Sequence, residues 1–69
     1  MPIIEMHLLA GRSVEKKRKA VAAVTAALVE SLDVRPEQVR ILITEHNDEQ
    51  FAIGGQMVGE RNAAAAQKP

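Results

Sequence analysis

The fold is decided by residues 14–32, which read Val-Glu-Lys-Lys-Arg-Lys-Ala-Val-Ala-Ala-Val-Thr-Ala-Ala-Leu-Val-Glu-Ser-Leu. At about 100° per residue, the larger apolar side chains of this stretch share one stripe of an α-helix. These residues are Val14, Val21, Val24, Leu28 and Leu32. Ser13 is a favourable N-cap residue, and Pro36 ends the helix because it pushes Arg35 out of the α region. The pattern therefore predicts one helix over residues 14–32.

Strand-like segments lie on both sides of this helix. Residues 2–9 alternate between an apolar face and a face that contains Glu5 and His7, and residues 39–45 also alternate. Residues 36–38 have the length of one short helical turn before the second strand. Two strands joined by a long helix form a β-α-β unit, so we expect parallel strands and a right-handed crossover.

The C-terminal part of the chain predicts a smaller element. After the polar loop at residues 46–50, residues 51–58 are typical of a β-hairpin, because Gly54 and Gly55 supply positive-φ positions. Residues 62–69 contain four consecutive alanines and form either a frayed helical end or a disordered tail. The fold class is α+β: a single β-α-β unit with a parallel two-stranded sheet and a C-terminal hairpin. We expect one domain over residues 2–61 and an Ala-rich tail over residues 62–69.

The chain is too small to be stable on a core of its own. It has 69 residues, no cysteine and one aromatic side chain, Phe51. A domain of this size buries only about 60% of the surface of its unfolded chain. Disulfides and a cysteine-based zinc site are excluded, so oligomerisation remains as the way to enlarge the core. We expect the sheet face opposite the helix to be apolar and to be covered by other chains.

Charge and composition exclude several partners. Nine basic and nine acidic residues give a net charge of zero, which is a poor basis for binding nucleic acid. The near-absence of aromatic residues also removes the stacking surface that single-strand binders use. The sequence contains neither an apolar stretch of membrane-spanning length nor a signal-peptide pattern. We therefore expect a cytoplasmic protein without a nucleic-acid or membrane partner.

Pro2 directly follows the initiator methionine. Removal of Met1 would leave a free secondary amine, which can act as a base or a nucleophile at the start of a strand. If Met1 is retained, Pro2 is an amide nitrogen and cannot shuttle protons. A proline at this position is a weak signal by itself, so its neighbours decide its meaning.

The sequence resembles the 4-oxalocrotonate tautomerase family in several separate segments, which lie at the same distances from Pro2 as in the family. The resemblance runs without a gap from Pro2 to about Gly55. It rests on Pro2 and on residues 7–13, 31–33, 39–45 and 51–55. The family consists of short β-α-β chains that assemble as hexamers built from dimers, so the resemblance implies a homo-hexamer.

The resemblance also implies roles for four residues. The Pro2 amine would shuttle a proton between two carbons of an enol or a β,γ-unsaturated 2-oxo acid such as 2-hydroxymuconate. Arg12 would bind a substrate carboxylate, and Arg40, reaching in from a neighbouring chain, would hold the 2-oxo and carboxylate end. Phe51 would form an apolar wall. The implied enzyme is an isomerase for small dicarboxylates or 2-oxo acids that needs no metal and no organic cofactor.

Elementary chemistry is consistent with these roles. Nearby guanidinium groups and an apolar ring disfavour an ammonium, so we expect the pKa of the Pro2 amine to fall. Guanidinium groups bind carboxylates bidentately and stabilise charge that develops on a carbonyl oxygen. Taken singly, each residue also has an ordinary structural explanation: Arg12 flanks a helix start, Arg40 extends along a strand face, and Phe51 belongs to the core.

Two other functions fit the same fold. In a dehalogenase or hydratase, Pro2 would protonate carbon while a carboxylate activates water. A catalytically silent subunit of a hetero-oligomer would use the fold as a scaffold, and retention of Met1 would favour it. Arg35, Gln38 and Ala52 depart from the family pattern, and the first two leave the substrate open. We expect His7 and His46 to be structural or exposed, and residues 16–19 to form a solvated face.

Overall fold

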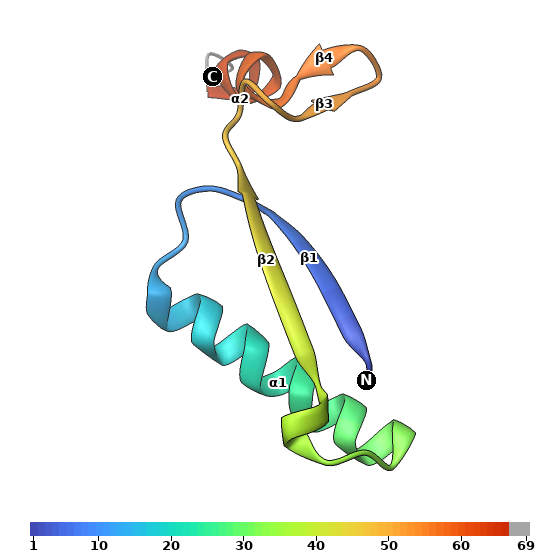
Figure 1. Cartoon of the computed structure of the whole chain (residues 1–69). Coiled ribbons are helices and arrows are strands. Elements are labelled where there is room, and N and C mark those ends of the chain that lie inside the picture. Colours follow the sequence, from blue (N-terminus) through green and yellow to red (C-terminus); the bar gives the residue numbers. More distant parts are fainter. Residues whose placement is uncertain (67–69) are drawn as a thin grey trace.

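The computed structural model describes the backbone of residues 1–66 and the side chains of residues 1–62. Strand β1 and helix α1 come first, followed by a 3-10 turn η1, strand β2, the hairpin β3–β4 and helix α2 (Figure 1). Their bounds are β1 Ile3–Leu9, α1 Val14–Leu32, η1 Pro36–Gln38, β2 Arg40–His46, β3 Ala52–Ile53, β4 Gln56–Met57 and α2 Val58–Ala66. The predicted fold class is confirmed, with β1 and β2 parallel and β3 and β4 antiparallel.

Helix α1 begins and ends at the predicted residues. The Ser13 side chain accepts a hydrogen bond from the Lys16 backbone N–H at 3.2 Å, and Glu15 lies in the first turn. The helix ends at Leu32, and its C-cap residue Asp33 adopts the left-handed conformation with φ 56° and ψ 47°. An L-residue with a side chain is strained there, and its negative charge lies at the negative end of the helix dipole.

Replacing Asp33 with glycine is expected to raise the free energy of unfolding by about 0.5–1 kcal/mol, because glycine adopts the left-handed conformation freely and carries no charge. Urea unfolding at one fixed chain concentration measures the change, since assembly makes stability depend on concentration. Asp33→Asn, which removes the charge alone, should show a smaller gain. A glycine variant less stable than the parent would contradict this account.

Strand β2 runs from Arg40 to His46, one residue later than the predicted 39–45. Val39 is held by the preceding turn, because its N–H donates to the Pro36 carbonyl at 3.1 Å. At the other end, the Ala10 N–H donates to the His46 carbonyl at 2.7 Å and extends the ladder. The register pairs Ile3 with Arg40 and Leu9 with His46. Hydrogen bonds at both ends therefore shift the strand by one position.

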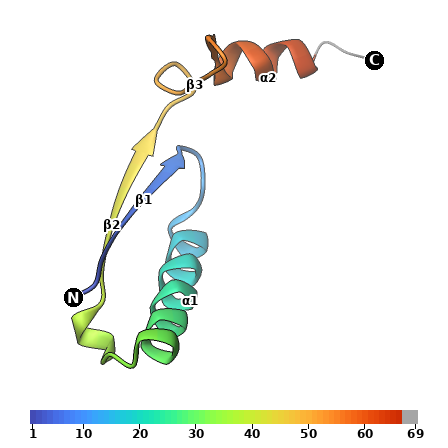
Figure 2. The ribbon, with the colours of Figure 1, turned by 90° about the vertical axis from the view of Figure 1, so that its right-hand side faces the viewer.

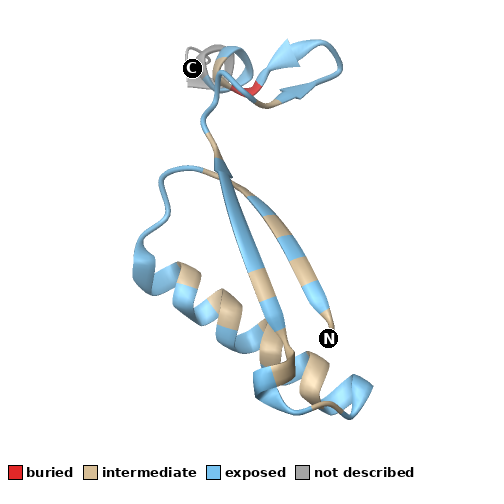
Figure 3. Cartoon of the chain, viewed as in Figure 1, coloured by how far each residue is buried: buried red, intermediate tan, exposed pale blue. Residues whose placement is uncertain are grey.

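Helix α1 lies along one face of the two strands (Figures 1 and 2). On β1 the alternation is visible in Figure 3, where the half-buried residues Ile4, Met6 and Leu8 interrupt exposed ones. Strand periodicity places Ile3 and Leu42, 48% and 56% exposed, on the opposite face. Glu5, His7, Arg40, Thr44 and His46 share that face. The prediction that it would be apolar is therefore wrong, because the polar residues of both strands alternate onto it.

The hairpin is shorter than predicted. Gly54 and Gly55 have φ values of 59° and 82°, as the turn requires. Val58, predicted as the last hairpin residue, instead begins α2, and its N–H donates to the Phe51 carbonyl at 2.8 Å. The first five residues of the predicted tail, 62–66, belong to this helix, while residues 67–69 lie outside the described residues.

The single chain is open. Its radius of gyration is 16.0 Å, whereas a compact domain of this length has about 11 Å. Its accessible surface is 5479 Å², against about 4,200 Å² for a folded monomer of this mass. Among the residues with described side chains, Val58 is the buried one, at 7% exposure (Figure 3). This excess surface supports the expectation that other chains complete the core. None of the helices in the described part of the chain is long and apolar enough to cross a membrane.

Candidate functional site

Pro2 and Arg40 lie together at the end of the sheet where both parallel strands begin. The Arg40 N–H donates to the Pro2 carbonyl at 3.0 Å, next to the pairing of Ile3 with Arg40. Pro2 is half-buried, and Arg40 is exposed. The backbone of β2 thus holds Pro2 in place. Arg40 of the same chain lies on the neighbouring strand, beside Pro2.

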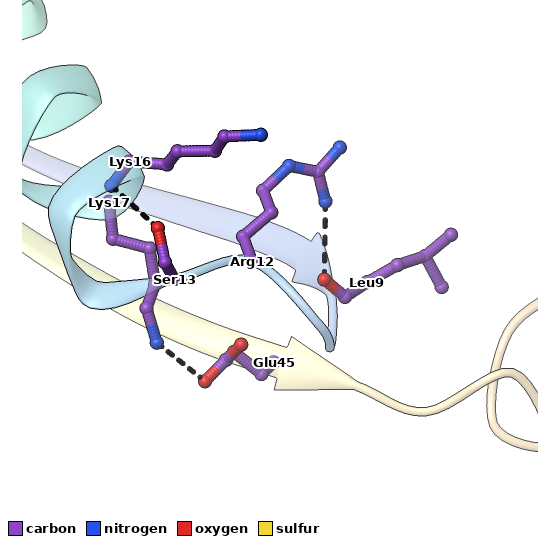
Figure 4. Close-up of polar contacts among 6 residues, drawn as sticks. All are labelled: Leu9, Arg12, Ser13, Lys16, Lys17 and Glu45. Carbon is purple, nitrogen blue, oxygen red and sulfur yellow. Dashed lines mark hydrogen bonds and ion pairs between the residues drawn. The ribbon is translucent and has the colours of Figure 1, made fainter.

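Arg12 and Phe51 lie at the opposite end of the strands. Arg12 belongs to the loop after β1, and its Nη1 donates to the Leu9 carbonyl at 3.2 Å (Figure 4). This bond uses one side of the guanidinium, and the residue is otherwise exposed. Phe51 follows the turn after β2, is half-buried, and is anchored by the Val58 N–H on its carbonyl.

The length of β1 keeps these two groups apart. The strand has seven residues, and at about 3.3 Å per residue it spans about 20 Å. This distance is far beyond the reach of an arginine side chain. Arg12 and Phe51 therefore cannot meet Pro2 of their own chain, and a site that contains all four predicted residues needs at least two chains.

The basic run at residues 16–19 is mostly a solvated face, but Lys17 differs from its neighbours. Lys16, Arg18 and Lys19 are exposed, whereas the Lys17 side chain is 21% exposed and forms an ion pair with Glu45 at 3.0 Å (Figure 4). This pair links α1 to the end of β2. Glu45 is thereby engaged with α1.

Arg35 and Gln38, two of the departures from the family pattern, are hydrogen-bonded to each other across η1, with Arg35 as its N-cap residue. The Arg35 N–H donates to the Gln38 Oε1 at 2.9 Å, and the Gln38 N–H donates to the Arg35 carbonyl at 3.0 Å. The Arg35 side chain lies 3.6 Å from Glu37. The two residues therefore stabilise the turn that leads directly to Arg40.

The two histidines contact each other, which sequence reasoning missed. The His7 Nδ1 and the His46 Nε2 are 2.8 Å apart on the sheet face opposite α1. Strand alternation and the parallel register together would have revealed the pair, since Thr44 pairs with His7 and His46 lies two residues further on the same face. In the described part of the chain, no three histidine, cysteine, aspartate or glutamate residues are grouped as metal ligands.

Comparison with known proteins gives a consistent result. The family model for tautomerase enzymes matches residues 2–61. A 2-hydroxymuconate tautomerase from Pseudomonas putida is 40% identical over 62 residues, which cover 90% of this chain and 98% of the relative.

Solved structures of tautomerases also have a similar fold. A 4-oxalocrotonate tautomerase isozyme from Methylibium petroleiphilum is 60% identical, with a TM-score of 0.89, covering 91% of this chain and 98% of its own. A heterohexamer 4-oxalocrotonate tautomerase from Chloroflexus aurantiacus is 32% identical, with a TM-score of 0.83 and coverage of 87% and 97%.

Proposed function

The chain belongs to the tautomerase family and is an isomerase of the 4-oxalocrotonate tautomerase type; from this premise, we propose that it isomerises 2-hydroxydienoates and related 2-oxo acids with Pro2 as its base and acid. 2-Hydroxymuconate is the proposed test substrate, because a relative that acts on it is 40% identical. The observation that supports the proposal is the backbone hydrogen bond from the Arg40 N–H to the Pro2 carbonyl, which holds Pro2 at the end of the sheet where its amine would be exposed after removal of Met1.

In the proposed reaction, the Pro2 amine removes a proton from the 2-hydroxyl group of a 2-hydroxydienoate, or from the carbon next to the keto group of a β,γ-unsaturated 2-oxo acid. The electron pair delocalises into a dienolate, and the protonated amine returns the proton to the distal carbon. Protons and electrons balance without a cofactor. The Pro2 nitrogen needs a lone pair for this step, so Met1 must be removed.

The other three residues bind and orient the substrate in this proposal. Arg40, reaching in from a neighbouring chain, holds the carboxylate and keto oxygens and stabilises the negative charge of the dienolate. Arg12 binds the second carboxylate, and Phe51 shields the reacting carbons from water. The span of β1 requires that Arg12 and Phe51 come from a different chain than Pro2. A homo-hexamer, built as three dimers, is the assembly that we propose.

An ultraviolet ketonisation assay on 2-hydroxymuconate and phenylenolpyruvate tests this function. The protein must be free of an N-terminal tag, and its intact mass must show that Met1 is absent. Rapid ketonisation of at least one substrate is expected. A processed protein without such activity would refute the proposal, whereas a mass that retains Met1 would favour the catalytically silent subunit.

Mixing two inactive variants tests the sharing of the site between chains. Pro2→Ala and Arg12→Ala chains, unfolded together and refolded in equal amounts, should regain activity. Random assembly leaves about one quarter of the sites with both native residues if these come from different chains. If both residues came from one chain, every mixed site would lack one of them and no activity would return. Separately refolded variants are the control.

A further inference from the structure

His7 and His46 meet edge to edge. Their nearest nitrogens are 2.8 Å apart, their ring centroids are 5.1 Å apart, and the ring planes differ by 22°. The centroid separation exceeds the nitrogen–nitrogen distance by twice the distance from an imidazole centroid to a ring atom. The two centroids and the two nitrogens therefore lie nearly on one line. The rings are therefore not stacked face to face. They share an N–H···N hydrogen bond, in which one imidazole donates and the other accepts.

His46 also contacts Phe51. Their ring centroids lie 6.4 Å apart with an angle of 75° between the planes. This is the edge-to-face arrangement that aromatic rings favour at separations of about 4.5–7 Å. His7, His46 and Phe51 therefore form a row of three rings, which connects the sheet to the segment after β2.

Backbone hydrogen bonds hold the main chain at His46 and at Phe51, but they do not orient the side-chain rings. The His46 carbonyl accepts from Ala10, and the Phe51 carbonyl accepts from Val58. Between them, the turn is closed by the Gln50 N–H on the Asn47 carbonyl at 3.1 Å. These backbone bonds do not set the side-chain torsions of Phe51, which is half-buried. A side-chain contact is needed to orient it.

We propose that His46 is a positioning residue for Phe51, with His7 holding the His46 ring in the required orientation. This inference rests on the proposed function, in which Phe51 is the apolar wall of the site. A displaced wall loses contact with the bound substrate, so loss of its orientation should raise KM more than it lowers kcat. The hydrogen bond to His7 selects one orientation of an imidazole that could otherwise turn.

Two substitutions of His46 separate the contribution of its aromatic ring from that of its hydrogen bond to His7. His46→Gln can keep a hydrogen bond to His7 but loses the aromatic edge, and it should raise KM about two- to tenfold. His46→Phe keeps an aromatic ring but loses the hydrogen bond, and it should restore part of this loss. Gln50→Ala, which changes an exposed residue beside Phe51 in the chain, is the matched control and should leave KM unchanged.

A double-mutant cycle distinguishes positioning from general stabilisation. If His46 acts through Phe51, His46→Gln should have no further effect on KM in a Phe51→Ala background. If the two effects multiply, His46 acts independently and the inference is overturned.

A spectroscopic measurement keeps this test separate from the proposed function. The chain has two histidines and one phenylalanine, so NMR signals of these rings are assigned by residue type. We expect a scalar coupling between the two hydrogen-bonded ring nitrogens, and a shift of the Phe51 ring signals in both His46→Gln and His7→Phe. Unchanged Phe51 signals would overturn the positioning role even if ketonisation is rapid. Absent ketonisation with shifted signals would refute the function alone.

Discussion

Pro2→Ala is expected to lower kcat for ketonisation about 10²–10⁴-fold, the usual contribution of a positioned general base and acid. The N-terminus of the variant is a primary amine, which rotates freely about the N–Cα bond. The proline ring instead holds its nitrogen in one orientation. The substrate carboxylates still bind to the arginines, so KM should change much less than kcat. Stopped-flow ultraviolet spectroscopy on 2-hydroxymuconate measures both constants.

The control for this substitution is assembly. The Pro2 carbonyl accepts the Arg40 N–H, and alanine has the same carbonyl, so the strand pairing should survive. An unchanged oligomer and circular dichroism spectrum would assign the loss of rate to the amine. Equal rates for the parent and the variant would refute proton transfer by Pro2.

Arg40→Ala is expected to lower kcat/KM about 10²–10³-fold, because a side chain that stabilises a developing oxyanion is lost. Arg40→Lys should recover only part of the activity, since an ammonium is a point charge and cannot bind a carboxylate bidentately. Both variants keep the backbone N–H that bonds to Pro2, so the register of the sheet is preserved. The difference between them therefore reports on the guanidinium itself.

The way in which the loss of activity in Arg40→Ala divides between kcat and KM shows what Arg40 binds. If Arg40 binds the keto oxygen as charge develops, kcat should fall along with kcat/KM. If it binds only the ground-state carboxylate, KM should rise at constant kcat. An Arg40→Ala variant with the parent's kcat/KM would remove Arg40 from the site. Phenylenolpyruvate, which has one carboxylate, serves as the comparison substrate, because its binding should depend less on Arg12 than on Arg40.

The local elements were the most predictable part of the fold. Helix α1 begins after Ser13 and ends before Asp33 as expected, because capping and helical periodicity depend on neighbouring residues. Strand β2 was displaced by one residue, since hydrogen bonds from η1 and from Ala10 set its ends. The start of α2 at Val58 was missed, because alternating hairpin residues pass directly into helix there.

The candidate site was predictable as a set of residues but not as an arrangement. Pro2, Arg12, Arg40 and Phe51 were named from a resemblance, which indicates residue types and order. Only the paired strands reveal that Pro2 and Arg40 lie at one end and Arg12 and Phe51 at the other. The ring contacts of His46 were equally invisible, because they join residues far apart in the chain.

The amino-acid sequence is enough to predict the β-α-β order, the limits of α1, the glycine turn of the hairpin and the need for a larger core. These features follow from local backbone preferences and from chain length. Only the folded chain shows the row of His7, His46 and Phe51 and the separation of Pro2 from Arg12. The physical reason is that the register of two parallel strands sets which distant side chains meet, and that register is formed only when the strands pair.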